Sequence, residues 1–398
     1  MARNRVIYQS EALYASPTDA ATGSCRMDHG FTTAANKPKQ IQRVQNANYS
    51  FSIERQDVNQ FGELAAIDRI ILTSPTVSLD FQYLVANMVN EDNLGFHVSA
   101  TAGGWKSCIS GILNKSTDEK CYYIRTTAEG SDAGGDSAVD HDDAGQSVIG
   151  LGNSYITSYT AEGSVGNFPT VSINVEALNM KVYNSVSGEF IPAVIAATGA
   201  ADSANKFVLA DAQRHTESTA ATNANTLTTS VLRPGDVEIK IYDAGATTVY
   251  GGSGSDDAGA NIDHTDTSGA RAKLQSYNVS FDLSRTPLEQ LGSKFAFSRE
   301  IDFPVTITAS VEAMVSDMVD GGLSQIITDD KNLDIYINVK DPASSAINAA
   351  YHIKQAKLDS QEFSSGVGDN KSVTLNFSAQ VGGPGQSNVG FFMSGVFN

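Results

Sequence analysis

Apolar and polar residues alternate most regularly over residues 305–313. Valine, isoleucine and alanine occupy every second position there, and threonine, serine and glutamate occupy the positions between them. A period of two places successive side chains on opposite faces of a strand, so one face is expected to be buried and the other polar. The same alternation occurs earlier in the chain with the apolar residues Val77, Leu79, Phe81 and Tyr83. Both stretches are predicted to be β-strands.

Other stretches that are rich in β-branched and aromatic residues predict further strands. These predicted strands cover residues 49–55, 122–126, 171–177, 279–284, 335–340 and 373–379. Residues 84–90 and 314–320 depart from strict alternation, and each segment is predicted to form a short helix that covers a sheet edge. The pattern as a whole predicts a mainly β, antiparallel fold with short helices.

The chain contains one unit twice. Residues 51–62 return as residues 281–292, and the match runs without a gap from Asn48 and Asn278 to Val89 and Val319. Farther along, the spacing between matching residues changes from 230 to 202. The residues that match at the second spacing are Ser158, Val165, Gly166, Val171, Asn174 and Ala177. They correspond to Ser360, Val367, Gly368, Val373, Asn376 and Ala379. We interpret the repeat as a duplicated domain.

Each copy has turn-forming residues after its first strand. In the second copy, Thr286 and Pro287 suit the N-cap and first position of a helix, and Gly292 suits a left-handed C-cap. The repeated signature therefore predicts a strand, one short helical turn and a sharp stop. Gly62 is expected to end the same turn in the first copy.

The repeat divides the chain into four segments. These are an N-terminal arm at 1–47, a first domain at 48–178, an insertion or linker at 179–272 and a second domain at 273–398. The arm mixes turn formers with polar residues and is expected to pack on its own domain or on a neighbour. The insertion contains strand-like runs, and two interpretations fit it: a small β-module or an elaborated hairpin.

The negative net charge of the chain argues against a protein that binds nucleic acid. The chain has 45 acidic and 27 basic side chains, a net charge of −18 at pH 7. A protein that grips nucleic acid is expected to show a basic patch, and none is visible in the sequence. Residues 129–146 are especially acidic, and no Lys or Arg occurs between Arg125 and Lys181. Repulsion between like charges is expected to keep this loop solvated and mobile.

The sequence suggests neither a membrane span nor a disulfide framework. No stretch approaches the roughly 18 apolar residues that a span needs, and no apolar h-region follows the basic N-terminus. The protein is therefore expected to be soluble and made in the cytoplasm. Cys25, Cys108 and Cys121 are far apart and form no CxxC pair, so they are expected to be free thiols.

Motifs for catalysis or metal binding are nearly absent from the sequence. It lacks GxxxxGK[ST], HExxH and GxSxG, and its six histidines are isolated from one another. Residues 251–256 match the start of a calcium nonapeptide, but there is one copy and such sites need stacked copies, so a flexible loop is the preferred interpretation. Residues 140–143 are interpreted as an exposed acidic tip. No catalytic residue, metal ligand or cofactor is predicted, and the protein is not expected to be an enzyme.

The repeat singles out four matched pairs of residues as candidates for an assembly contact. They are Arg55 and Arg285, Gln60 and Gln290, Gly62 and Gly292, and Arg69 and Arg299. A guanidinium beside an apolar strand face needs a carboxylate or carbonyl partner, and one interpretation is an ion pair across a subunit boundary. The alternative is a surface arginine whose aliphatic stem covers the sheet.

The repeated unit resembles the tail tube (major tail) proteins of long-tailed bacteriophages. The resemblance lies in residues 51–62 and 281–292, the alternating strand that follows, and the closing turn at Gly166 or Gly368 with its terminal strand. It covers about 48–178 and 278–381. It implies two tandem tail-tube-like antiparallel β-sandwich or barrel domains, whose inner sheets join side by side into a ring around a channel. Family members with two fused domains form trimers with pseudo-sixfold symmetry.

On this resemblance the protein is expected to be a structural virion protein, located in the tail, whose homotrimeric rings stack into an acidic-lined tube for genome ejection. The expected partners are further copies of itself, a tape-measure protein, the tail terminator, baseplate proteins, and double-stranded DNA in passage without specific binding. No membrane partner is expected. Two alternatives stay open: another tube-derived part, such as a baseplate hub or terminator ring, and a carbohydrate- or cell-surface-binding β-protein.

Overall fold

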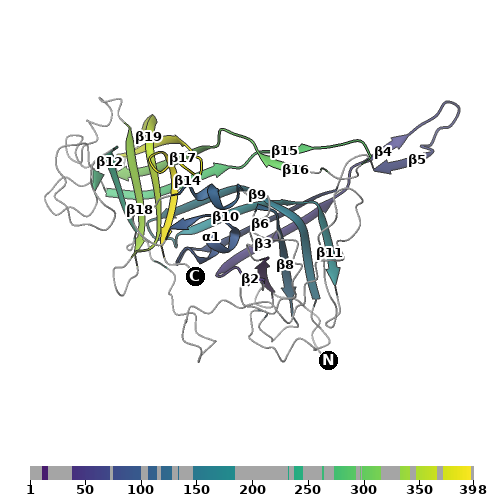
Figure 1. The fold of residues 1–398 in the computed structure, drawn as a ribbon, viewed down its shortest axis with the longest axis horizontal. Coiled ribbons are helices and arrows are strands. Elements are labelled where there is room, and N and C mark those ends of the chain that lie inside the picture. The colour runs from purple at the N-terminus through teal and green to yellow at the C-terminus, as the bar shows by residue number, and fades with distance from the viewer. Residues whose placement is uncertain are drawn as a thin grey trace.

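The chain folds into a mainly β structure, as the sequence predicts, in a computed structural model (Figure 1). The described residues are 11–16, 38–71, 75–99, 106–113, 118–127, 133, 147–183, 232, 237–244, 262–263, 273–292, 296, 298–314, 332–340, 347–364 and 371–395. Their sheets are largely antiparallel, and two short helical segments accompany them: α1 (Val89–Leu94) and a 3-10 turn (Cys108–Gly111). The predicted fold class, an antiparallel β-sandwich type with short helices, is confirmed.

Eight strands form one continuous antiparallel sheet, which we call the central sheet. Their order is β3 (Val44–Ser52), β6 (Thr76–Leu84), β10 (Thr170–Ala177), β9 (Ser147–Ser164), β14 (Lys273–Asp282), β17 (Thr306–Met314), β20 (Ser372–Gln380) and β19 (Ile347–Ser364). The first four strands come from the first half of the chain and the last four from the second. The two halves therefore meet where β9 pairs with β14.

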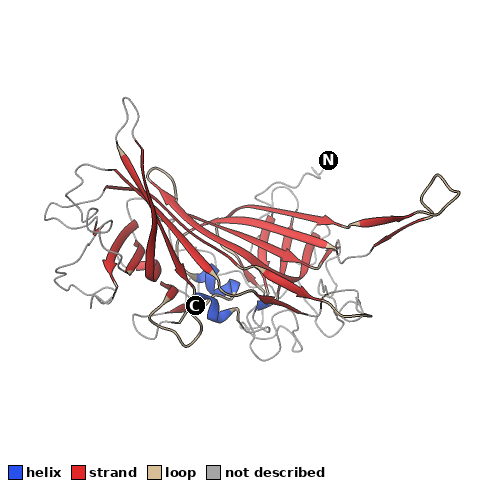
Figure 2. Cartoon of the chain, turned by 90° about the horizontal axis from the view of Figure 1, so that it is seen from above, coloured by secondary structure: helices blue, strands red, loops and turns tan. Residues whose placement is uncertain are grey.

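The long strands β9 and β19 each belong to two sheets. Each has 18 residues and contains one residue with a left-handed backbone, Asn153 (φ 53) in β9 and Gln355 (φ 58) in β19. Before that point, β9 pairs with β8 (Lys120–Thr126) and β11 (Asn179–Tyr183). The start of β19 pairs with β18 (Leu333–Lys340) and β21 (Gly390–Gly395). Each half thus has a second sheet beside its part of the central sheet. Figure 2, seen from above, shows long strands that span the body.

The two halves share the same strand pairing, residue by residue. Asn46 pairs with Gln82 between β3 and β6, and Ser276 pairs with Glu312 between β14 and β17, at a spacing of 230. The β9–β10 and β19–β20 pairings correspond in the same way at a spacing of 202. Even the irregularities coincide, because the β9–β10 bulge beside Asn174 matches the β19–β20 bulge between Leu358 and Ser360.

Strands outside the predicted domain limits also match. β1 (Glu11–Ala15) pairs with β8, and β12 (Val237–Asp243) pairs with β18 in the equivalent register. β2 (Lys39–Gln40) and β13 (Ile262–Asp263) extend these pairs. The segments predicted as an arm at 1–47 and an insertion at 179–272 therefore each add strands to a second sheet.

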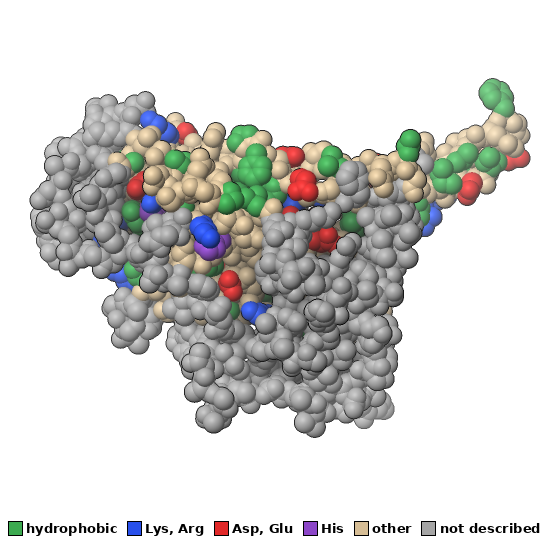
Figure 3. Space-filling model, in the orientation of Figure 1, with side chains coloured by type: hydrophobic (Ala, Val, Ile, Leu, Met, Phe, Trp, Pro, Cys, Tyr) green, Lys and Arg blue, Asp and Glu red, His purple; other side chains and the backbone are tan. Residues whose placement is uncertain are grey.

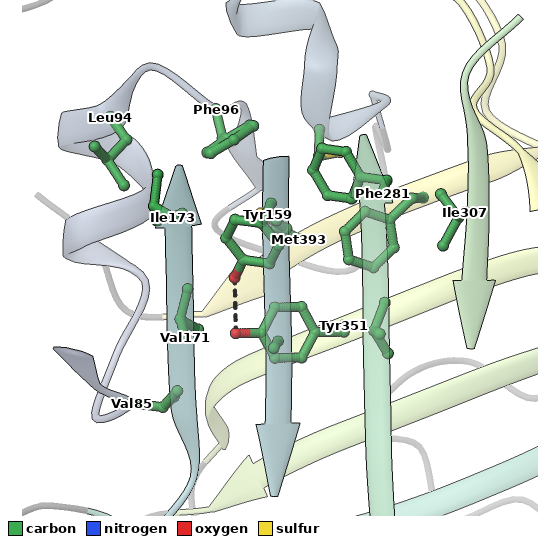
Figure 4. Close-up of a cluster of buried hydrophobic side chains, with 14 of the residues drawn as sticks. Val85, Leu94, Phe96, Tyr159, Val171, Ile173, Phe281, Ile307, Tyr351 and Met393 are labelled. Atoms are coloured by element: carbon green, nitrogen blue, oxygen red, sulfur yellow. Dashed lines mark hydrogen bonds between the residues drawn. The ribbon is translucent and has the colours of Figure 1, made fainter. Parts of the chain in front are cut away.

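One hydrophobic core runs through both halves between the sheets. The alternating residues Val77, Leu79, Phe81 and Tyr83 are buried, as predicted, and so are Ile307, Ala309, Val311 and Ala313. Aromatic rings connect the halves, because Phe281 stacks on Tyr159 with ring centroids 5.3 Å apart (Figure 4). Such pairs stabilise a fold by about 1 kcal/mol beyond the area that they bury. The two halves thus form one folded body.

The predicted helical turn after each first strand is wrong. Arg285–Leu288 is a strand, β15, which pairs with β16 (Ser298–Ile301), and β4 (Arg55–Val58) pairs with β5 (Asp68–Ile71) in the same register. A two-stranded ribbon tolerates Pro287, because a proline on an edge strand need not donate to a ladder. Gly62 (φ 96) and Gly292 (φ 85) have the expected left-handed backbone, but they lie in hairpin turns.

The other element predictions have mixed outcomes. Strands β8, β10, β18 and β20 confirm the runs predicted at 122–126, 171–177, 335–340 and 373–379. The first predicted helix is displaced, since β6 continues to Leu84 and α1 begins at Val89. The second, at 314–320, lies outside the described residues except for Met314, which ends β17.

Several sequence predictions cannot be placed in this fold. The acidic loop at 129–146 (apart from Ala133), its tip at 140–143 and the glycine-rich motif at 251–256 lie outside the described residues, and so does Cys25. Cys108 and Cys121 are buried free thiols, as expected.

Candidate assembly interface

The junction between the two halves is built as a sheet edge joined to a sheet edge. We call it the seam. Its register runs from Ser276 opposite Ser164 to Asp282 opposite Ser158. One further backbone bond continues it, in which the Leu283 N–H donates to the Thr157 carbonyl at 2.7 Å. The halves are therefore joined by main-chain hydrogen bonds, which do not depend on side-chain identity.

The β15–β16 hairpin of the second half lies against the first half, beside β9 in Figure 1. The Arg285 guanidinium donates two hydrogen bonds to the Asp118 carboxylate, at 2.5 and 2.7 Å. Both side chains are buried, with exposed fractions of 5% and 9%. The guanidinium also lies over the Tyr155 ring at 4.9 Å, and its Nε donates to the Ile156 carbonyl at 3.4 Å. This bidentate geometry holds the hairpin in one orientation.

Burial raises the pKa of Asp118 above its usual range, although the neighbouring Arg285 opposes this shift. Removing two charges from water costs free energy that only close, well-oriented pairing recovers. The two carboxylate oxygens each accept from Arg285, so the carboxylate is matched as long as the arginine is present.

A second ion pair lies on the same side of the seam. Arg299 of β16 donates from Nη1 to Glu176 of β10 at 2.6 Å, and the arginine side chain is 9% exposed. The sequence singled out Arg285 and Arg299 but not their acidic partners. Repetition could not reveal these acids, because the position matched to Glu176 at the 202 spacing is Ser378.

The β4–β5 hairpin of the first half has a different environment. It projects from the body in Figures 1 and 3, and nearly all of its residues are exposed, including Arg55. Arg69 pairs with Asp57 inside the hairpin at 2.5 Å, with both side chains largely exposed. The remaining candidates, Gln60 and Gly62 here and Gln290 and Gly292 in the other hairpin, lie in exposed turns. A role of these residues in contacts between chains stays a prediction.

The central sheet ends in two edges that have one partner strand each among the described strands. They are β3, paired with β6, and the last part of β19, paired with β20. Large apolar side chains are exposed on both: Phe51 is 41% exposed on β3 and Phe363 is 44% exposed on β19. Unpaired main-chain groups on an edge strand are a template for pairing with another chain.

The face of the central sheet that points away from the core is polar and carries few basic residues, among them Lys273 opposite Met314 and Lys357 opposite Ser378. No Lys or Arg occurs in 46–52, 76–84, 158–164, 170–177, 276–282, 306–314, 360–364 or 372–380. Hydroxyl groups hydrogen-bond across neighbouring strands, for example Ser50 with Ser78 at 2.7 Å and Ser280 with Thr308 at 2.9 Å. The carboxylates on this face are Asp80, Glu162, Glu176, Asp282, Glu312 and Glu362.

A buried carboxyl group, which the sequence did not single out, links the halves inside the core. Glu91 of α1 accepts hydrogen bonds from Tyr83 at 2.8 Å and Tyr159 at 3.2 Å. Tyr159 and Tyr351, from opposite halves, share a hydrogen bond at 3.0 Å (Figure 4). Burial raises the pKa of Glu91 to about 7. A carboxyl enclosed in this way contributes to packing and has no access to a substrate.

The described residues contain no group of three or more His, Cys, Asp or Glu side chains that could hold a metal ion. Among the helices of the same part of the chain, none has both the length and the apolar character that a membrane crossing requires.

Comparison with known proteins identifies no family. No protein-family model and no curated protein matches the sequence. Among solved structures, the chain is similar to the sheath/tube terminator of an extracellular contractile injection system, with 10% identity over 45% of this chain and 96% of the other and a TM-score of 0.27. It is also similar to a chain of the anti-feeding prophage baseplate (11% identity, 40% and 93% covered, TM-score 0.28). A chain of the tail of a GTA particle gives 16% identity, 37% and 92% coverage and a TM-score of 0.23. At these TM-scores the function has to be inferred from the strand pairings of this chain.

Proposed function

We propose that this chain is a non-enzymatic structural protein of a phage-type tail. Three copies form a ring, and stacked rings form the tail tube. The chain is an internal duplication of one tail-tube unit, so a ring of three chains has six similar wall segments. Other copies of the chain, a tape-measure protein in the channel, and terminator and baseplate proteins at the tube ends are its partners in the virion.

The seam supports this proposal most directly. Strand β3 has the place in the first half that β14 has in the second, and β19 has the place that β9 has in the first. β14 and β9 are paired inside the chain, whereas the equivalent edges β3 and β19 are not paired with each other. Joining β19 of one chain to β3 of the next repeats the seam. A closed ring of such joins leaves no sheet edge exposed.

The polar face of the central sheet suits the wall of a channel for DNA. Its carboxylates repel phosphates, and the small number of Lys and Arg side chains on it limits the contacts that release counterions and retain DNA. The net charge of −18 acts in the same direction. The genome passes along such a wall without being bound.

The hairpin tips suit contacts between stacked rings. The side chains of Phe61, Leu64 and Leu291 are fully exposed. Apolar tips that insert into a different surface of the next ring form a head-to-tail contact that does not close, and repetition of that contact produces a tube.

Electron microscopy and light scattering of the purified full-length protein test the proposal. The expected result is regular tubes or stacked rings, built from particles with three times the chain mass of 42.1 kDa. A lone stable ring that does not stack would point to a terminator ring or baseplate hub instead. A protein that stays monomeric at high concentration, or binds glycans as a monomer, would exclude the tube.

A further inference from the structure

The two hairpins of this chain have the same strand pairing but unequal surroundings. In β15–β16, Arg285 and Arg299 are buried against the first half of the chain. In β4–β5, the apolar residues Ile67, Ile70 and Ile71 are 49%, 39% and 38% exposed. Isoleucines in the middle of a two-stranded ribbon are unexpected when both faces meet water. The β4–β5 hairpin therefore exposes apolar side chains that a partner surface would bury.

The fold itself indicates what that partner surface is. β15 follows β14 directly, and its hairpin lies on the half that supplies β9, the strand paired with β14. β4 follows β3 in the same way. When β3 pairs with β19 of another copy, the β4–β5 hairpin must lie on the half that supplies that β19. The partner surface therefore belongs to a second copy of this chain, because the new contact would repeat the seam that already joins the two halves of one chain.

The template also predicts the register. Asn278 pairs with Glu162 and Asp282 with Ser158 at the seam. Subtracting 230 from the β14 residues gives Asn48 and Ser52 on β3, and adding 202 to the β9 residues gives Ser364 and Ser360 on β19. The predicted pairs are therefore Asn48 with Ser364 and Ser52 with Ser360 of the second copy. In this register Tyr49 lies opposite Phe363. Two edges that now expose aromatic side chains would cover each other, as Val279 and Ala161 do at the seam.

The charges at the new junction differ from those at the seam. At the seam, Arg285 donates a hydrogen bond to the carbonyl of Ile156, and Thr157 is the next residue of β9. The equivalent residues of the second half are Leu358 and Asp359, and Asp359 is exposed on β19. Arg55 in the place of Arg285 would reach this carboxylate. Lys331 replaces Asp118, Lys357 replaces Tyr155 and Ser378 replaces Glu176. None of these side-chain contacts of Arg285 and Arg299 at the seam is therefore repeated.

We infer that the β3 edge and the β4–β5 hairpin dock on β19 of a second copy in this register, with an ion pair between Arg55 of one chain and Asp359 of the next. The inference rests on the proposed ring and specifies the residues that join its chains. Arg69 takes no part in the docking, because its guanidinium already forms an ion pair with Asp57 within the hairpin.

A charge exchange tests the ion pair in the full-length protein. Arg55→Glu and Asp359→Arg are each expected to raise the concentration needed for ring assembly about tenfold, the change that 1.4 kcal/mol produces. The double variant is expected to restore assembly, because the pair is then reversed. Arg69→Gln serves as the control and is expected to assemble as the wild type does. Failure of the double variant to assemble better than either single variant contradicts the ion pair.

Cysteine cross-linking tests the register independently. Chains carrying Tyr49→Cys are mixed with chains carrying Phe363→Cys and oxidised, and a covalent dimer is expected, since directly opposite residues on paired strands lie close enough for a disulfide. Ser50→Cys in place of Tyr49→Cys points to the other face and is expected to give no dimer. If the wild type forms rings but no Tyr49–Phe363 cross-link appears, the docking is wrong and the ring stands. If the wild type forms no rings, the proposed function fails as well.

Discussion

Arg285 and Asp118 form the most enclosed ion pair at the seam, with side chains 5% and 9% exposed. Removing the arginine would leave a buried carboxylate without its counter-charge, whereas the matched Arg55 lies in water in the single chain. The two arginines therefore have unequal effects on a single chain even though the repeat makes them equivalent.

Arg285→Ala is expected to lower the free energy of unfolding by roughly 3 to 5 kcal/mol, the usual cost of leaving one partner of a buried pair alone. Urea denaturation below the assembly concentration measures the change. Arg55→Ala is the matched control and is expected to unfold at the wild-type urea concentration. Equal effects of the two substitutions would show that the seam does not depend on this pair.

Glu91 makes the stability of the core depend on pH. Its pKa is about 7 in the folded chain, above the ordinary 4.5, so the folded state binds the proton more tightly than the unfolded state does. The stabilisation is complete below pH 4.5 and is lost as the pH rises through 7. The loss amounts to roughly 3 to 4 kcal/mol, at 1.4 kcal/mol for each pH unit between the two values.

Glu91→Gln is expected to remove that part of the pH dependence, because the amide keeps an oxygen for Tyr83 and Tyr159 and does not ionise. Unfolding by urea at pH 5 and pH 8 measures the effect as the difference between variant and wild type. Other buried carboxyls, such as Asp118, contribute equally to the pH dependence of both proteins, so their contributions cancel in the difference. An unchanged difference between the two pH values would show that Glu91 does not titrate in this range.

At the scale of elements, each hairpin is an extension whose role depends on what lies beside it. The β4–β5 hairpin adds few buried contacts to its own chain, since almost all of its residues are exposed. Its tip carries Phe61 and Leu64 into solvent. Such a segment stabilises an assembly more than a monomer.

Replacing residues 59–67 by Asn-Gly is expected to leave the melting temperature of the single chain unchanged and to abolish ring stacking. The shortened hairpin keeps the pairing of Val58 with Asp68, and Asn-Gly suits a two-residue turn. Calorimetry and electron microscopy measure the two properties separately. A lower melting temperature would mean that the hairpin belongs to the core of its own chain, and normal tubes would exclude a role in stacking.

At the scale of the whole molecule, the central sheet has one apolar face and one polar face on which acidic side chains outnumber basic ones. Asp80 and Asp282 lie on the polar face, one in each half, and both are exposed. If this face lines the channel, its charge decides whether DNA slides or is held.

Asp80→Lys combined with Asp282→Lys is expected to make assembled tubes retain double-stranded DNA that wild-type tubes release. Each phosphate that a lysine neutralises releases counterions, so retention should weaken steeply as salt is added. Co-sedimentation of labelled DNA with tubes over a salt series measures this. Equal retention by variant and wild type would place the polar face elsewhere than on the channel.

The strands and their faces could be predicted from the sequence alone. The alternation at Val77 to Tyr83 and at Ile307 to Ala313 needs only the two-residue period of a strand, and burial follows it closely. The sequence also predicted a repeat, and the strand pairings of the two halves correspond at the spacings of 230 and 202. Both properties are local or periodic, so no knowledge of distant contacts is required.

The surroundings of each repeated residue depend on tertiary contacts that the sequence pattern does not reveal. Thr286 and Pro287 suit a helix start locally, but pairing with β16 overrides that preference. Arg55 and Arg285 match in sequence, yet one is exposed and the other is buried against Asp118, because β14 has a partner edge within the chain and β3 has none among the described strands. The long-range pairing of β9 with β14 makes this difference, and no local pattern in either strand specifies which edge it will meet.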